Sequence, residues 1–246
     1  MNACMKLRAG QRAALLFALL ALFGSTTGAQ NFAPNSKSNS AQTSALNSTQ
    51  SRDEQYKINY HLSMPNPASH LFEVRITVET PLVVEAVDFQ MPRWSPGRYA
   101  VFDFAKNVQE ARATTFCAPP AFCDAATLPL TRLDTQTWRV FPGKAQGVAL
   151  SYKVFANDLS GTFSQLDARH ANFNGGSLFM YVVGHKPDPV RLSIDAPAGW
   201  RIINSATERA DQREWQFPNY DILIDTPTEI APDFTIDEFK VDGKTY

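Results

Sequence analysis

Hydrophobic and polar residues alternate along most of the chain after residue 55. In "LFEVRITVE", Phe72, Val74, Ile76 and Val78 are hydrophobic, and the residues between them are polar or charged. A period of two is typical of a β-strand with one buried face, because successive side chains point to opposite sides of the sheet. The same pattern occurs in "YKINYHL" (56–62), "TWRVF" (137–141), "VALSYKV" (148–154), "VRLSIDAP" (190–197) and "EWQF" (214–217).

Residues that favour turns separate these segments, as in Pro142-Gly143 and Ala198-Gly199. Many short strands at regular spacing, without a long helical period, predict an all-β fold, an antiparallel β-sandwich. The segment from Ser177 to Gly184, "SLFMYVVG", is hydrophobic throughout and is interpreted as a central strand. A short helical turn is expected near residues 95–107, where Ser95 could cap a helix that has Pro96 at its first position.

The first residues are typical of a secretory signal peptide. Lys6, Arg8 and Arg12 precede the hydrophobic run "AALLFALLALF", and small residues follow it. We therefore predict a signal peptide over residues 1–29 and a secreted or periplasmic protein, with no membrane contact after cleavage. Residues 30–55 are rich in Ser, Asn, Gln and Thr and predict a disordered linker. Residues 56–246 then form one β-domain.

The charge balance argues against one class of partner. The formal net charge is −1, and removal of the three cations in the signal peptide makes it more negative. A mildly acidic secreted protein is a poor binder of nucleic acid, which attracts basic surfaces.

Two cysteines remain after the signal peptide, Cys117 and Cys123 in "TFCAPPAFCDA". In an oxidising compartment we expect them to form a disulfide. A metal site is a weak alternative, because two thiolates at this spacing lack a second pair of ligands.

The sequence contains no recognisable catalytic motif. None of its four histidines is followed by Glu, so the HExxH pattern of zinc peptidases is missing. A G-x-S-x-G elbow and phosphate-binding glycine motifs are missing too. His170 with Asp167 is a conceivable base and orienting group, although a surface histidine is the simpler interpretation. Asp221, Asp225 and Glu229 could be metal ligands, but they fit an acidic surface loop better. We predict no catalytic residue, no metal ligand and no cofactor in this chain.

Four segments together resemble a known family. They are "MPRWSPGRYAVFDFAKNVQEARA", "VFANDLSGTFSQLDARHANFNGGSLFMYVVG", "PAGWRI" and "FPNYDILIDTPTEIAPDFTIDEFKVDGKTY". In this order and spacing they resemble the N-terminal domain of the glycyl-aminopeptidase-like, PDZ-containing metallopeptidases, metallopeptidase family sixty-one. The resemblance covers nearly all of residues 56–246.

In that family the β-rich domain precedes a thermolysin-like catalytic domain, which carries HExxH and a downstream Glu for zinc. The resemblance therefore implies a non-catalytic domain, whose partner is a zinc-peptidase catalytic domain on a separate chain or in a missing part. The segment 234–246 is expected to be a strand, a turn at Asp242-Gly243 and the start of a return strand that never forms, as in a truncated or split protein. The alternative hypothesis is a stand-alone secreted module that binds a peptide or protein.

The resemblance also suggests two candidate sites. Trp94, Tyr99, Phe102 and Phe104 lie on a proline-rich segment and could contact the catalytic domain, since aromatic residues on a stiff backbone bury area at low entropic cost. They could equally close one end of their own sandwich.

The second candidate is the turn formed by Asn174, Gly175, Gly176 and Ser177. By analogy with related aminopeptidases it could face a substrate cleft. The plain alternative is a hairpin turn, because Asn-Gly favours positive φ.

Overall fold

The structure is a computed structural model that describes residues 55–80, 83–95, 97–98, 100–121, 123–235 and 237–245. The predicted signal peptide and the predicted linker, apart from Gln55, lie outside these residues. The described residues form several sheets of mostly antiparallel strands and one short α-helix. The all-β fold class predicted from the alternating pattern is therefore confirmed. Among the described residues, no helix has the length and hydropathy that a membrane crossing requires.

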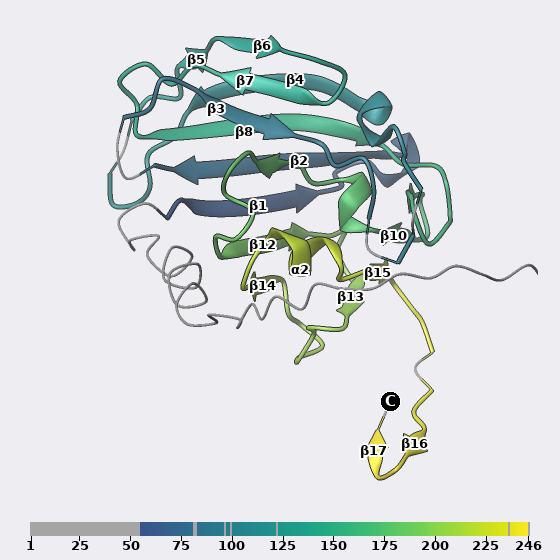
Figure 1. The fold of residues 1–246 in the computed structure, drawn as a ribbon. Helices are drawn as coiled ribbons and strands as arrows, with labels where there is room; N and C mark the ends of the chain where they lie inside the picture. The colour runs from purple at the N-terminus through teal and green to yellow at the C-terminus, as the bar shows by residue number, and fades with distance from the viewer. Residues whose placement is uncertain are drawn as a thin grey trace, which may run out of the picture. The chain divides into compact units, whose positions relative to one another are not determined.

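The largest sheet has seven strands in the order β14-β12-β1-β2-β8-β4-β5 (Figure 1). Its strands are β1 (Lys57–Ser63), β2 (Leu71–Glu79), β4 (Val108–Thr115), β5 (Thr127–Leu128), β8 (Gly147–Phe155), β12 (Val190–Asp195) and β14 (Glu214–Phe217). One pair, β1 and β12, runs parallel, whereas the other neighbours are antiparallel. This pair is the one parallel neighbour in a sheet that is otherwise antiparallel, as the sequence predicted.

Two four-stranded sheets complete the domain, in the orders β11-β3-β7-β6 and β13-β15-β10-β9. The first contains β3 (Val87–Gln90), β6 (Leu130–Arg132), β7 (Thr137–Val140) and β11 (Tyr181–Val182). The second contains β9 (Ser164–Leu166), β10 (Ala171–Phe173), β13 (Arg201–Asn204) and β15 (Thr228–Ala231). The helical elements are the α-helix α2 (Tyr220–Ile224) and the 3₁₀ turns η2 (Pro67–Ser69), η3 (Phe104–Asn107) and η4 (Gly175–Ser177).

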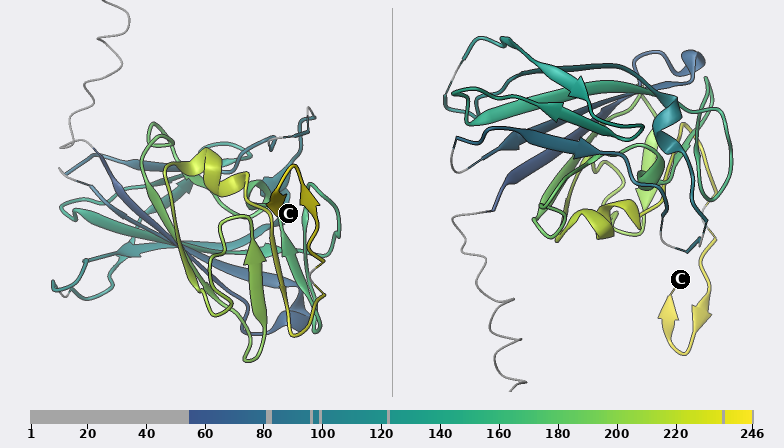
Figure 2. Two further views of the ribbon diagram at one scale, coloured as in Figure 1. Left: turned by 90° about the horizontal axis from the view of Figure 1, so that it is seen from below. Right: turned by 45° about the horizontal axis from the view of Figure 1, so that its top comes forward.

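The hydrophobic core lies against one face of the large sheet. Along β2, half-buried and buried side chains alternate without a break, with Phe72 and Ile76 fully buried. They share one core with Phe89 of β3 and Phe173 of β10. Each smaller sheet thus contributes to the same core, and Figure 2 shows the layers from two further sides. The opposite face of the large sheet is mostly polar.

The segment interpreted as a central strand is buried but is not a strand over most of its length. Leu178, Phe179 and Met180 are fully buried, yet β11 contains only Tyr181 and Val182. Buried backbone groups need polar partners, and here tyrosine hydroxyls supply them in place of a neighbouring strand.

Three buried tyrosines make these bonds. Tyr152 donates to the carbonyl of Leu178 at 2.8 Å and accepts from the amide of Met180 at 3.0 Å. Tyr220 donates to the carbonyl of Phe179 at 2.7 Å, and Tyr60 to that of Met180 at 2.9 Å. Burial raises the pKa of each of these phenols. We call residues 178–180 the tyrosine-bound segment.

A short helical element does occur within residues 95–107, but at its end. The 3₁₀ turn η3 begins at Phe104, whereas Arg98 donates its amide to the carbonyl of Ser95 across a turn with φ of 80° at Gly97. A positive φ in the third position of such a turn suits glycine. Ser95 therefore starts a β-turn and does not cap a helix.

The last described residues also differ from the expectation. β16 (Lys240–Val241) and β17 (Lys244–Thr245) pair with each other in an antiparallel hairpin, so the return strand does form. Asp242 and Gly243 have φ of 50° and 77°, as a two-residue hairpin turn of type I′ requires.

Candidate functional site: the Trp94 loop and the groove beside it

The Trp94 loop, here the described residues within 93–102, follows β3 in the chain and carries exposed hydrophobic side chains. Its base is closed by the amide of Phe102, which donates to the carbonyl of Arg93 at 2.6 Å. Trp94 is 55% exposed and Val101 is 73% exposed. The loop thus presents large apolar groups to solvent on a hydrogen-bonded backbone.

The four residues predicted for an interface differ in how far they are buried. Phe104 is fully buried in the core of its own domain and cannot contact another one, so its assignment to an interface is wrong. Phe102 is half-buried and stacks on Phe104 with ring centres 5.4 Å apart, and both rings contact Phe163. Tyr99 lies outside the described residues. Trp94 remains the exposed member, and Val101 is an exposed neighbour that the sequence reasoning did not select.

A groove of about 490 Å³ lies beside Trp94. It is lined by Gln90, Met91, Pro92, Arg93, Trp94, Gln136, Tyr181, Lys186, Asp221 and Ile224. These residues come from β3, β11, α2, the Trp94 loop and the segments that connect them. The lining combines apolar side chains with charges of both signs. Such a mixed surface suits a polypeptide better than a purely apolar ligand.

Lys186 contacts both an aromatic ring and a carboxylate in the groove. Its ammonium group lies 4.2 Å from the ring centre of Tyr181 and 3.9 Å from a carboxylate oxygen of Asp221. Burial, and then the charge of Asp134, raise the pKa of Tyr181. Tyr181 therefore stays a neutral hydrogen-bond donor, and it donates to the Gln90 side chain.

The Asn174–Ser177 turn is buried and packs against the Trp94 loop. Gly175–Ser177 form the 3₁₀ turn η4, and Asn174 caps it with φ of −97°, so this is not a hairpin turn. A side chain at Gly176 would lie 3.0 Å from the β-carbon of Ser95, and one at Gly175 would lie 2.9 Å from the α-carbon of Ile224. The predicted close approach at Gly176 is thus made by the chain itself.

The first residue of this turn lines a cavity. Asn174 contributes to a second cavity of about 370 Å³, together with Asn172 and Glu229. Gly175, Gly176 and Ser177 are buried and do not line it. A cleft-facing role for the whole turn therefore does not fit the structure.

His170 and Asp167 do not form a catalytic pair. One oxygen of Asp167 accepts the backbone amides of Arg169 and His170, which lowers the pKa of this carboxyl group. The imidazole of His170 instead lies 2.6 Å from Glu229, its one hydrogen-bond partner in the described part of the chain. Without a nucleophile beside it, this pair ties the loop before β10 to β15.

A second histidine, His185, is held by a carboxylate and an aromatic ring that the sequence analysis did not identify as its partners. His185 lies 2.8 Å from the buried carboxylate of Asp188, and its ring stacks on Tyr56 with centres 3.4 Å apart. Asp188 also accepts the backbone amide of Tyr56 at 2.9 Å. This cluster attaches the first described residues to the domain. The i,i+3 spacing of His185 and Asp188 was the one available signal.

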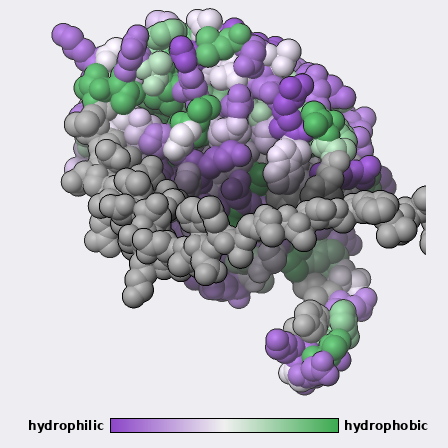
Figure 3. Space-filling view, in the orientation of Figure 1, coloured by the Kyte–Doolittle hydropathy of each residue, from purple (hydrophilic) through white to green (hydrophobic). Residues whose placement is uncertain are grey.

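The residues that the structure describes contain no group of His, Cys, Asp and Glu that could hold a metal ion. Asp221, Asp225 and Glu229 therefore do not converge. Figure 3 shows that the described surface on one side is largely hydrophilic, with separate hydrophobic areas.

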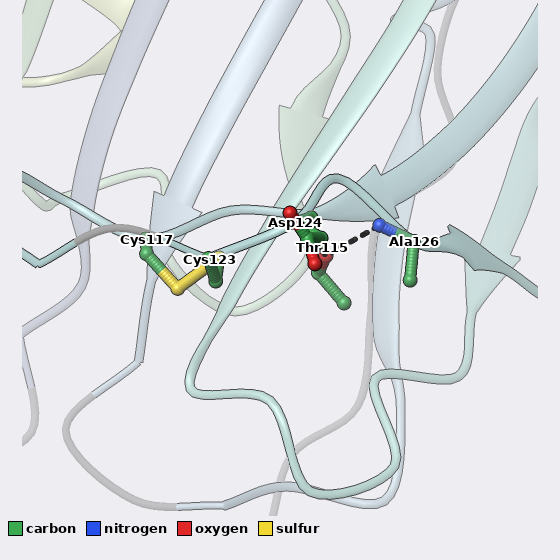
Figure 4. The surroundings of a disulfide bond; sticks show 5 residues. All are labelled: Thr115, Cys117, Cys123, Asp124 and Ala126. Carbon is green, nitrogen blue, oxygen red and sulfur yellow. Dashed lines mark hydrogen bonds between the residues drawn. A yellow bond between two sulfur atoms is a disulfide. The ribbon is translucent and has the colours of Figure 1, made fainter.

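Cys117 and Cys123 form a disulfide with an α-carbon separation of 5.8 Å (Figure 4). Beside it, the hydroxyl of Thr115 donates to the carbonyl of Asp124 and accepts the amide of Ala126. The bond closes the short loop between β4 and β5, at the edge of the large sheet.

Comparisons with known proteins assign this domain to a class, the N-terminal domains of peptidases. A family model described as the Peptidase M61 N-terminal domain matches residues 59–232. The chain belongs to the Peptidase M61 N-terminal domain family. The resemblance derived from the four sequence segments is thereby confirmed.

Among solved structures, the aminopeptidase N family protein from Idiomarina loihiensis is similar, with a TM-score of 0.67 and 29% identity. The likeness covers 76% of this chain but 31% of that protein, so the chain spans less than a third of its length. An M1 zinc metallopeptidase from Deinococcus radiodurans gives a TM-score of 0.39 at 13% identity, over 78% of this chain and 46% of its own. Leukotriene A4 hydrolase from Saccharomyces cerevisiae gives 0.38 at 10% identity, over 73% and 29%. The comparison with curated proteins gives no match.

Proposed function

We propose that this chain is the non-catalytic N-terminal β-domain of a secreted, aminopeptidase-like metallopeptidase, and that it packs against a zinc-peptidase catalytic domain. The observation that carries the proposal is the match of the Peptidase M61 N-terminal domain over residues 59–232. The similar Idiomarina loihiensis protein, of which this chain covers 31%, supports the same conclusion. In this proposal the chain supplies no zinc ligand and no catalytic group.

The Trp94 loop is the proposed contact surface. Trp94 and Val101 are exposed hydrophobic side chains on a loop whose base is closed by a backbone hydrogen bond. Exposed aromatic groups on an ordered backbone lose little entropy on binding and are common at the centre of interfaces.

The test combines the purified chain with the Idiomarina loihiensis protein from which the matching N-terminal part has been removed. We expect a complex, and we expect Trp94→Ala to weaken it by about tenfold, a typical effect for an interface aromatic. Leu133→Ser, at another exposed hydrophobic position, is the matched control and should leave binding unchanged. Equal effects of both variants would contradict the assignment of the surface.

An aminoacyl-anilide assay tests the absence of catalysis. The chain alone should give no turnover with or without Zn²⁺, and turnover should arise only from the catalytic part. Turnover by the chain alone that disappears in His170→Ala would overturn the proposal.

Secretion is the remaining part of the proposal. It is supported by the signal-peptide pattern of residues 1–29 and by the disulfide between Cys117 and Cys123. Sequencing the mature N-terminus from a fractionated cell checks it, and the expected first residue is Gln30. An intact N-terminus in the cytoplasmic fraction would contradict it.

A stand-alone secreted binding module is the second candidate function. The groove beside Trp94, with its mixed apolar and charged lining, favours it. This candidate predicts that the chain binds a peptide or protein while remaining unable to associate with any zinc-peptidase catalytic part.

A further inference from the structure

The polar face of the large sheet carries an ordered row of side chains. The strand register places His61 of β1 opposite Arg75 of β2, and Arg75 opposite Ser151 of β8. Ser151 in turn lies opposite Arg112 of β4. Neighbouring strands are about 4.8 Å apart, so this row places Arg75 and Arg112 on either side of Ser151.

A β-bulge puts Arg112 into this row. Gln109 pairs with Lys153 and Arg112 pairs with Ser151, so Glu110 and Ala111 together oppose the single residue between those partners. Without the extra residue, Arg112 would pair with Leu150 and face the core. A shift of one residue moves a side chain to the other face of a sheet, and bulges are a common way to redirect one.

The bulge residue is itself held in an uncommon conformation. Glu110 has φ of 51°, and its carboxylate lies 2.8 Å from the ammonium group of Lys153. Lys153 also lies 3.8 Å from Glu73. The hydrogen bond from Lys153, and then its charge, lower the pKa of Glu110. The carboxylates of Glu73 and Glu110 are thus both paired with Lys153.

The two arginines are paired less closely, and Arg112 contributes only the smallest of the effects that lower the pKa of Glu110. Among the described residues, neither guanidinium forms an ion pair, and the one hydrogen bond of Arg75 is a 3.5 Å contact with the hydroxyl of Ser151. Arg75 is half-buried and Arg112 is exposed, and arginines whose neighbouring carboxylates are paired with Lys153 favour an added anion. Both arginines line a hollow of about 340 Å³, here called the Arg75 hollow, whose lining also includes His61, Glu73, Ser151 and Lys153.

We propose that the Arg75 hollow binds an oxyanion of the phosphate class, held between the guanidinium groups of Arg75 and Arg112 and above the hydroxyl of Ser151. Guanidinium groups donate parallel hydrogen bonds to phosphate oxygens. A tetrahedral dianion presents oxygens in several directions and can meet two guanidinium groups at once, whereas a single carboxylate presents one planar edge. This site is on the opposite face of the sheet from the core and does not depend on the proposed peptidase partner.

The test is a calorimetric titration of the purified full chain with inorganic phosphate at low ionic strength. We expect saturable binding that weakens about tenfold in Arg75→Gln and in Arg112→Gln, because each substitution removes a charged hydrogen-bond donor. Arg191→Gln is the matched control, since Arg191 is an exposed arginine of β12 that does not line the hollow, and it should change the affinity less than about twofold. Thermal unfolding of each variant checks that it is folded.

Two further arms identify the source of the anion. Sulfate should compete with phosphate and acetate should not. Co-sedimentation with phosphatidylglycerol vesicles that is lost in the two arginine variants would assign the site to a lipid headgroup, and phosphate binding without co-sedimentation would assign it to a soluble phosphate compound. The absence of saturable phosphate binding, or an equal loss in Arg191→Gln, would overturn the proposal.

Discussion

The Trp94 loop and the tyrosine-bound segment are both rich in large hydrophobic residues, yet they occupy opposite environments. Leu178, Phe179 and Met180 are 0% exposed, whereas Trp94 and Val101 are 55% and 73% exposed. The difference lies in the partners of the backbone. The buried segment is hydrogen-bonded by tyrosines from three distant elements, and the loop is closed by its own backbone. Backbone outside helices and strands can be buried in a core only where other polar groups hydrogen-bond its amides and carbonyls.

The largest expected effect is that alkaline pH destabilises the buried tyrosine-bound segment, whereas the exposed Trp94 loop has no buried tyrosine hydroxyl to lose. Burial raises the pKa values of Tyr60, Tyr152 and Tyr220 in the folded protein. In the unfolded chain these tyrosines have their ordinary pKa near 10, so the unfolded chain loses the protons at a lower pH than the folded protein does. Their contribution to stability is complete below that pH and is lost above it. We expect the free energy of unfolding to fall by about 4 kcal/mol per pH unit above pH 10, because three protons are involved.

Urea denaturation at several pH values, with phenolate absorbance recorded in parallel, measures this dependence. The three phenols should ionise only as the chain unfolds. Free titration of all tyrosines in the folded state would contradict the buried hydrogen bonds.

Removing one hydroxyl should have the next largest effect. Tyr152→Phe leaves the carbonyl of Leu178 and the amide of Met180 without partners, at a cost of about 3 kcal/mol in the free energy of unfolding. Tyr181→Phe is the control, because this half-buried hydroxyl bonds a side chain and no buried backbone group. Chemical denaturation that shows similar losses for both would refute the special role of Tyr152.

Gly175→Ala tests the turn that leads into the tyrosine-bound segment. The added carbon would lie 2.9 Å from the α-carbon of Ile224, so the backbone of α2 must move. Overpacking of this kind costs about 2 kcal/mol. Gly161→Ala, where the added carbon meets nothing within 4 Å, is the control, and differential scanning calorimetry on both variants measures the difference.

Trp94→Ala should have the smallest effect on stability, below about 0.5 kcal/mol, because the side chain is largely in solvent. Its effect should be on binding, as set out for the proposed catalytic partner. A large loss of stability in a thermal melt would place Trp94 within the core and would remove the contrast between the two regions.

Strands with one buried face could be predicted from the sequence, because a period of two follows directly from the geometry of a sheet. The alternation of Phe72, Val74 and Ile76 specifies which face is buried, and the structure agrees. The family could also be identified from the sequence, because its motifs are short local segments that can be read directly.

The exposure of individual aromatic residues could not be predicted. Phe104 and Trp94 lie in one hydrophobic stretch, but Phe104 is buried against Phe163, which lies far along the chain, whereas Trp94 is exposed. The tyrosines that bind residues 178–180 are likewise distant in sequence. Arg112 was missed because alternation places it on the core side, and only the bulge moves it to the polar face.

The parallel pair of β1 and β12 has a consequence for how the chain folds. β1 lies between β2 and β12, and the side chains of His61 and Ser193, which meet across the parallel pair, are 132 positions apart in sequence. During synthesis β1 can pair with β2 early, but its other edge stays open until most of the domain has been made. Closing such a long loop is entropically slow, so the completion of the large sheet should be a late event in folding. During refolding, hydrogen-exchange protection should therefore reach the β1–β2 pair before the β1–β12 pair.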